Sequence, residues 1–147
     1  MSHRMTLTLI WLLGLVICLV LVEMYFRLTV DGIPFLFPED TRGKYLKPVS
    51  TIYSIHIAGI LGAWFIRRFR PPSKDPDAKI LFIIAILCTL IWNIGVIYLV
   101  GQRHIWPYQG GTLVADLDIA VQFGTWFSFL VLPVNVYYFG IKSKNVE

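Results

Sequence analysis

One histidine lies inside a long apolar segment of this sequence, and its side chain is able to ligate a metal, carry a proton or donate a hydrogen bond. His56 stands in the pattern Ser-x-His-x-x-Gly of a predicted helix. Three interpretations stay open: a packing histidine bonded to a nearby hydroxyl or carbonyl, an axial ligand of a b-type haem, and a ligand of copper or another metal. A neutral imidazole is the least costly ionisable side chain to bury in a membrane, which favours the packing interpretation.

The two ligand interpretations need partner residues, and the sequence supplies few. A haem with two axial ligands would pair His56 with His104, or with Met24 as the remaining option. A copper or other metal site would add Asp116 or Asp118 to the two histidines. Both carboxylates also stand at the start of a predicted helix, where Asp caps N–H groups and suits the positive end of the helix dipole. Haem b and copper are therefore hypotheses that rest on irregular spacing.

Glu23 is the other candidate for chemistry, near the end of the first predicted helix. Its simplest role is an i,i+4 ion pair with Arg27 at the membrane interface. The alternative is a small homo-oligomeric channel or transporter with Glu23 or His56 on its pathway. The sequence contains no nucleophile–base pair, phosphate loop, zinc-protease motif or nucleotide-binding glycine loop, so nothing in it indicates an enzyme.

The composition predicts that the helices carrying these residues lie in a membrane. The chain has 147 residues, 56% hydrophobic and only 15% charged, with a mean hydropathy of +0.67, whereas soluble domains carry about 25% charged residues. We predict an all-α integral membrane protein with four transmembrane helices in a bundle and two ordered outer loops, as a single domain over 1–147. The helices are expected at about 6–28, 49–66, 80–100 and 119–141, since a span needs about 20 apolar residues.

Basic residues predict the orientation of this bundle. The loop after the second helix contains the basic residues Arg67, Arg68, Arg70, Lys74 and Lys79. With four helices, both termini lie on the same side as this loop, and that side carries more Lys and Arg than the other. The positive-inside rule therefore places both termini in the cytoplasm. The formal net charge of +4 then reflects membrane orientation rather than nucleic-acid binding.

Small residues crowd the second predicted helix. Ala58 and Gly62 are four residues apart, as are Gly59 and Ala63. Small residues at this spacing let a neighbouring helix backbone approach closely in a membrane. Because Gly59 and Ala63 share a helix face with His56, we expect His56 to point into protein rather than lipid.

These features together predict a function by association. We expect a small polytopic subunit of a larger membrane complex, of an oxidoreductase or respiratory kind, that acts through helix packing and its outer loops. Its partners would be the lipid bilayer and other membrane subunits or further copies of itself. The alternatives are a redox subunit that binds b-type haem or a metal through His56, and a small homo-oligomeric channel or transporter that uses Glu23 or His56.

Overall fold

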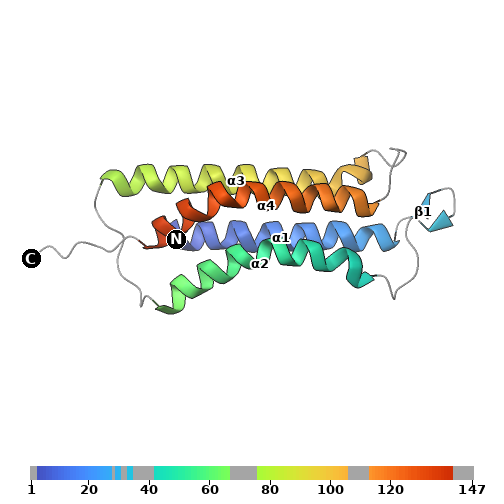
Figure 1. Ribbon diagram of the computed structural model, residues 1–147, viewed down its shortest axis with the longest axis horizontal. Coiled ribbons are helices and arrows are strands. Elements are labelled where there is room, and N and C mark those ends of the chain that lie inside the picture. Colours follow the sequence, from blue (N-terminus) through green and yellow to red (C-terminus); the bar gives the residue numbers. More distant parts are fainter. Residues whose placement is uncertain are drawn as a thin grey trace, which may run out of the picture.

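The computed structural model of the protein describes residues 3–27, 29–30, 33–34, 42–66, 76–105 and 113–140. Its helices are α1 (His3–Arg27), α2 (Arg42–Ile66), α3 (Pro76–Ile105) and α4 (Leu113–Gly140). Two short strands, β1 (Thr29–Val30) and β2 (Ile33–Pro34), follow α1 and pair antiparallel, with Thr29 opposite Pro34 and Val30 opposite Ile33 (Figure 1).

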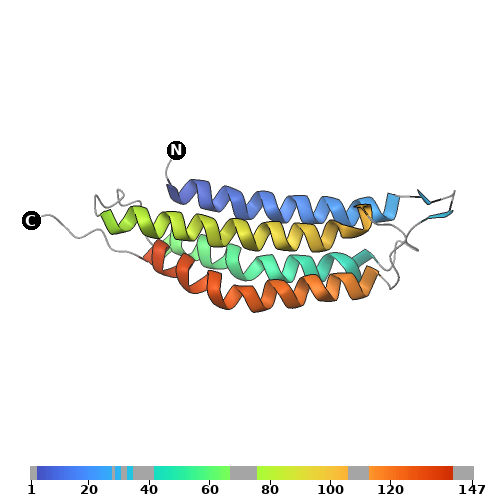
Figure 2. The ribbon, with the colours of Figure 1, turned by 90° about the horizontal axis from the view of Figure 1, so that it is seen from above.

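The four helices lie side by side and alternate in direction along the chain (Figures 1 and 2). α1 packs against α2 and α3, and α4 packs against the same two helices. The order around the bundle is therefore α1, α3, α4, α2. This arrangement confirms the prediction of an all-helical fold with four helices.

Three of the helices are long and apolar enough to cross a membrane, over Met5–Arg27, Lys79–Gln102 and Leu113–Asn135. A helix suits the bilayer interior because it satisfies its backbone hydrogen bonds within one segment. The chain is therefore an integral membrane protein whose helices contact lipid.

The helices extend beyond the apolar runs from which they were predicted. α2 begins at Arg42 rather than at 49, and it continues through Pro48. Proline removes one backbone N–H from the helix, while Ser50 Oγ and Thr51 Oγ1 donate to the carbonyls of Leu46 and Lys47 at 2.9 and 2.8 Å. Apolar runs mark the part of a helix that lies in lipid, whereas backbone hydrogen bonding continues into the polar residues on either side.

The two predicted outer loops, 28–48 and 101–118, are described in part, and most of the described part is helix rather than loop. Within those ranges the structure describes β1, β2, the first turns of α2, the last turn of α3 and the first turns of α4. In the predicted basic loop only Lys79 has a described side chain, and it is exposed on α3. The other four predicted topology residues of this loop lie outside the described residues.

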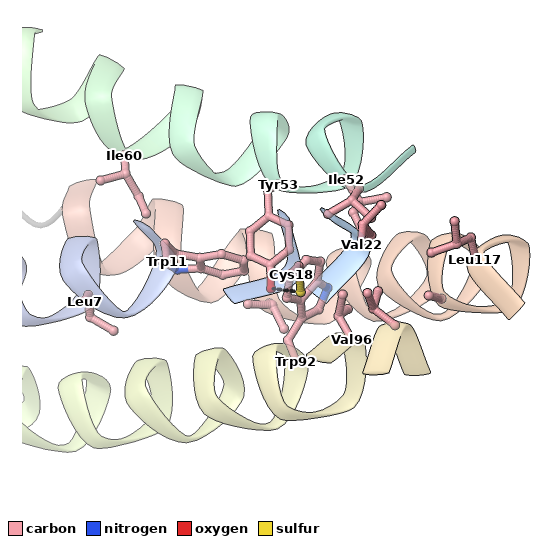
Figure 3. Close-up of a cluster of buried hydrophobic side chains, with 14 of the residues drawn as sticks. Leu7, Trp11, Cys18, Val22, Ile52, Tyr53, Ile60, Trp92, Val96 and Leu117 are labelled. Carbon is pink, nitrogen blue, oxygen red and sulfur yellow. Dashed lines mark hydrogen bonds between the residues drawn. The ribbon is translucent and has the colours of Figure 1, made fainter. Parts of the chain in front are cut away.

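Buried side chains fill the bundle along its length (Figure 3). Leu7 and Ile60 lie toward one end, Trp11 and Tyr53 follow, and Leu117 lies toward the other end. The outer surfaces of α1, α3 and α4 instead carry large exposed apolar side chains. This distribution is the one expected where lipid tails, rather than water, surround the protein.

Glycines let the helices approach one another at several buried or partly buried positions. A Cβ at Gly14 would collide with the side chain of Asn93, and a Cβ at Gly95 would collide with the ring of Phe123. At Gly124 it would lie 3.2 Å from the side chain of Ile52 and 3.3 Å from that of Trp92. The close packing within the chain thus depends on glycines of α1, α3 and α4.

Replacing Gly14 by alanine tests this close approach. Alanine favours a helix over glycine by about 0.8–1.0 kcal/mol, but overpacking of a core costs about 1–3 kcal/mol. We therefore expect Gly14→Ala to lower the thermal unfolding midpoint in detergent, followed by circular dichroism. The matched control is Gly59→Ala, because nothing lies within 4 Å of a Cβ at Gly59, and it should leave the midpoint unchanged or raise it. Equal midpoints for both variants would contradict the packing described at Gly14.

Candidate functional site

Side chains from all four helices meet around His56. This group is called the central cluster and consists of Trp11 of α1, Tyr53 and His56 of α2, Trp92 and Asn93 of α3, and Ser128 of α4. The imidazole of His56 stacks on the indole of Trp11, with ring centroids 4.0 Å apart and an interplanar angle of 14°. Trp92 meets the same imidazole edge-on, at 5.0 Å and 66°. His56 is thus enclosed between aromatic rings from two other helices.

Hydrogen bonds determine which nitrogen of His56 carries its proton. Ser128 Oγ donates to the carbonyl of Gly124 at 2.6 Å, and Trp92 Nε1 donates to the same carbonyl at 2.9 Å. His56 Nε2 lies 2.8 Å from Ser128 Oγ. Because the single Ser128 hydroxyl proton goes to Gly124, that oxygen accepts from His56 Nε2–H. Neutral His56 is therefore protonated at Nε2 and has a lone pair at Nδ1.

A second set of hydrogen bonds lies beside the first. Tyr53 Oη donates to Asn93 Oδ1 at 3.1 Å, and Asn93 Nδ2 donates to the carbonyl of Thr89 at 2.9 Å. Cys18 Sγ lies 3.4 Å from Tyr53 Oη (Figure 3) and is left as the donor of that contact. Thr89 and Asn135 link α3 to α4 through contacts of 3.4 Å. These polar groups are thus bonded to one another, as a membrane interior requires.

His104 belongs to a separate contact between α1 and α3. Its Nε2 donates to the carbonyl of Leu21 at 3.0 Å, and Tyr25 Oη donates to the carbonyl of Val100 at 2.7 Å. The rings of Tyr25 and His104 stack with centroids 4.0 Å apart at 15°. Each side chain therefore bonds the backbone of the other's helix. We call this reciprocal contact the α1–α3 clamp.

The structure does not bring His56 and His104 together. His56 stacks on Trp11 and His104 stacks on Tyr25, and both of these aromatic residues belong to α1. Trp11 and Tyr25 are 14 residues apart, which is about 21 Å along an α-helix at 1.5 Å per residue. Metal-bound nitrogens lie about 2 Å from the metal. The two imidazoles therefore cannot hold one iron or copper in this arrangement.

The other predicted ligand residues also lie apart from the central cluster. Met24 is exposed on the outside of α1, while Asp116 and Asp118 occupy the first turns of α4. Over the described ranges, no group of three or more His, Cys, Asp and Glu residues could hold a metal ion. Glu23 Oε1 lies 3.6 Å from Arg27 Nε in the i,i+4 arrangement predicted for them. The haem, copper and pathway roles stay predictions from sequence.

The small residues of α2 lie away from the interior of the bundle. Ala58 and Gly59 are exposed, Gly62 is half-buried, and nothing lies within 4 Å of a Cβ at either glycine. The side chain of Ala63 is outside the described residues. Close packing at these positions therefore requires a helix from outside this chain.

Sequence reasoning singled out His56 but not the residues that bond and stack on it. Ser128 and His56 are 72 positions apart in the sequence, and no local spacing pairs them. A usable signal was present: Trp11, Trp92 and Ser128 are side chains with polar atoms at mid-helix positions of apolar segments, where each polar atom needs a partner.

Replacing Ser128 by alanine removes the hydroxyl that accepts from His56. Interhelical hydrogen bonds in membrane proteins contribute about 0.6–1.7 kcal/mol, so we expect a loss of that size in the free energy of unfolding. Titration of the detergent-solubilised protein with sodium dodecyl sulfate measures it. Thr125→Ala is the matched control, because Thr125 is exposed on the same helix. If Ser128→Ala costs no more than Thr125→Ala, the His56–Ser128 bond does not stabilise the bundle.

The α1–α3 clamp is tested separately by Tyr25→Phe, which removes one hydroxyl and keeps the stacked ring. The expected cost is again about 0.6–1.7 kcal/mol, for one interhelical bond. Tyr98→Phe serves as the control, because Tyr98 is exposed to the surroundings of the bundle. The same titration should show destabilisation by Tyr25→Phe alone, and equal stability of the two variants would contradict the clamp.

Comparisons with known proteins add no family or relative to this description. No protein-family model matches the chain, and neither the curated proteins nor the solved structures include a match to it.

Proposed function

We propose that this chain is a non-catalytic membrane subunit that joins a larger membrane complex through the outer face of α2. The outer face of α2 denotes the exposed or half-exposed residues Thr51, Ser54, Ala58, Gly59 and Gly62. Ser54, Ala58 and Gly62 repeat at intervals of four and form a continuous small-residue stripe. Small residues at this interval let two helix backbones come close, and such contact drives helix association in lipid.

The main support for this proposal is the difference in size between the exposed side chains of α2 and those of the other three helices. Their outer surfaces bear large apolar side chains, among them Leu13 and Val16 on α1, Ile91 and Ile94 on α3, and Phe129 and Leu130 on α4. Among the described side chains of α2, the exposed large apolar ones are Ile55 and Leu61, beside the stripe. Lipid tails pack readily on large apolar side chains, whereas a stripe of small residues leaves room that a second helix fills. Association therefore belongs to α2, and lipid contact belongs to the other outer surfaces.

The hydroxyl groups on the outer face of α2 indicate what kind of partner suits it. Thr51 Oγ1 donates to the carbonyl of Lys47 at 2.8 Å, and Ser54 Oγ donates to the carbonyl of Thr51 at 2.7 Å. Both hydroxyl protons are thus used within α2. The fitting partner is a transmembrane helix of another subunit that offers close van der Waals packing rather than polar groups.

This role requires α2 to be a fourth membrane span. Residues 49–66 contain no charged side chain, and 18 residues of helix cover about 27 Å, close to the thickness of the hydrocarbon core. α2 also lies alongside α1 and α4 (Figures 1 and 2), which are themselves candidate spans. Four spans place both termini on one side, and the basic residues assign that side to the cytoplasm.

The redox and transport alternatives gain no comparable support. His56 contacts side chains of the other three helices and, in the part of the chain that the structure describes, belongs to no group of three or more metal-ligating residues, while Glu23 lies beside Arg27 at the end of α1. Nothing in the described residues favours an oxidoreductase assembly over another membrane complex. We therefore propose membership of a membrane complex without assigning its reaction.

Adding bulk to the outer face of α2 tests the proposal. We expect the wild-type chain, taken from its native membranes in mild detergent, to appear in native mass spectra with a different subunit of defined mass. The double variant Ala58→Leu/Gly62→Leu should reduce that species at least about tenfold, which corresponds to 1.4 kcal/mol. The control Ile91→Phe/Ile94→Phe adds bulk to the lipid-facing side of α3 and should leave it unchanged.

Three outcomes would contradict the proposal. A wild-type chain without partners in these spectra would exclude a stable complex. A complex unaffected by Ala58→Leu/Gly62→Leu would exclude the outer face of α2 as its interface. A complex of identical copies alone would replace the larger assembly by a homo-oligomer on the same surface.

A further inference from the structure

We propose that one water molecule binds within the central cluster, between Trp11 Nε1 and His56 Nδ1. These two atoms are the buried side-chain nitrogens or oxygens without a hydrogen-bond partner in the described part of the chain. Trp11 is 0% exposed and His56 is 2% exposed. The proposal does not depend on the role of α2 in association.

The two unpartnered atoms have complementary hydrogen-bonding roles. The indole Nε1–H of Trp11 donates only. His56 Nδ1 accepts, because the hydrogen bonds of Ser128 and Gly124 place the imidazole proton on Nε2. One bare donor and one bare acceptor therefore lie on neighbouring rings.

The geometry of the stack prevents these atoms from bonding each other directly. The rings are nearly parallel, with an interplanar angle of 14° and centroids 4.0 Å apart. An indole N–H and an imidazole lone pair both point outward in their own ring planes, so neither points at the other ring. Each therefore needs a hydrogen-bond partner other than the neighbouring ring.

Water has the chemistry that this position requires. It accepts from Trp11 Nε1–H with an oxygen lone pair and donates to His56 Nδ1 with one of its protons. Buried waters make about 2–4 hydrogen bonds to groups that otherwise have no partner. A metal cation does not suit the position, because it would be repelled by the indole N–H and would find one nitrogen ligand. Leaving both atoms unpaired is costly in a membrane interior, where no bulk solvent reaches them.

The water would complete a hydrogen-bonded chain across all four helices. Trp11 of α1 donates to the water, the water to His56 of α2, and His56 to Ser128 of α4. Ser128 donates to the carbonyl of Gly124, which also accepts from Trp92 of α3. Each of the four side-chain donors has one acceptor, and the chain ends at a carbonyl that only accepts. Without the water, α1 would take part through ring stacking alone.

Solid-state NMR of the full-length protein in lipid bilayers tests this inference. The chain is labelled with ¹⁵N-histidine, and the His56 signals are assigned by their loss in His56→Gln. We expect a neutral ring protonated at Nε2, an Nδ1 signal shifted to that of a hydrogen-bonded lone pair, and magnetisation transfer from water protons to Nδ1. An unshifted Nδ1 signal, a proton on Nδ1, or a hydrogen-bonded Nδ1 without transfer from water would each overturn it.

Removing the indole donor gives the matched comparison. Trp11→Phe keeps an aromatic ring beside His56 and loses the N–H, so the water transfer to Nδ1 should weaken several-fold. Trp126→Phe removes an exposed indole and should leave the transfer unchanged. Equal transfer in both variants would show that Trp11 does not hold the water. The wild-type spectrum decides whether the water is present even where Trp11→Phe does not fold.

Discussion

Polar groups inside a bilayer have to find their partners within the protein, and the interior of this bundle is arranged around that requirement. His56, Ser128 and Trp92 are bonded in one chain that ends at the Gly124 carbonyl, and Tyr53 bonds Asn93 beside it. These bonds join α2, α3 and α4 at one level. They also orient His56 so that its ring stacks on Trp11. This stacking adds a contact with α1, the remaining helix.

Close approach of the helices makes these bonds reachable, and the same packing explains which surface remains for a partner. Gly14 admits the Asn93 side chain and Gly95 admits the Phe123 ring, so the interior has its own close contacts. The small residues of α2 are not needed there. Ala58 and Gly59 face outward, and in lipid such a surface is suited to another helix. Internal polar bonding and the proposed outward association thus involve two different faces of α2.

Much of the fold could be predicted because the bilayer restricts it: long uncharged runs must be helices, and four of them predict a bundle. His56 was also expected to point into protein, and it is buried. Whether His56 and His104 lie close enough to share a metal could not be predicted from the sequence. Their positions along the bundle depend on how α2 and α3 pack against α1. The outward direction of Gly59 could not be predicted either, because spacing identifies a helix face without saying what the face meets.

Site-specific photo-crosslinking in native membranes tests the central claim most directly. A diazirine analogue of leucine at Leu61, which flanks the outer face of α2, is compared with the same analogue at Leu13 of α1 and Ile91 of α3, all exposed positions. The division of faces predicts protein crosslinks from position 61 and lipid crosslinks from positions 13 and 91. Lipid crosslinks from all three positions, or protein crosslinks from 13 or 91 instead of 61, would contradict it.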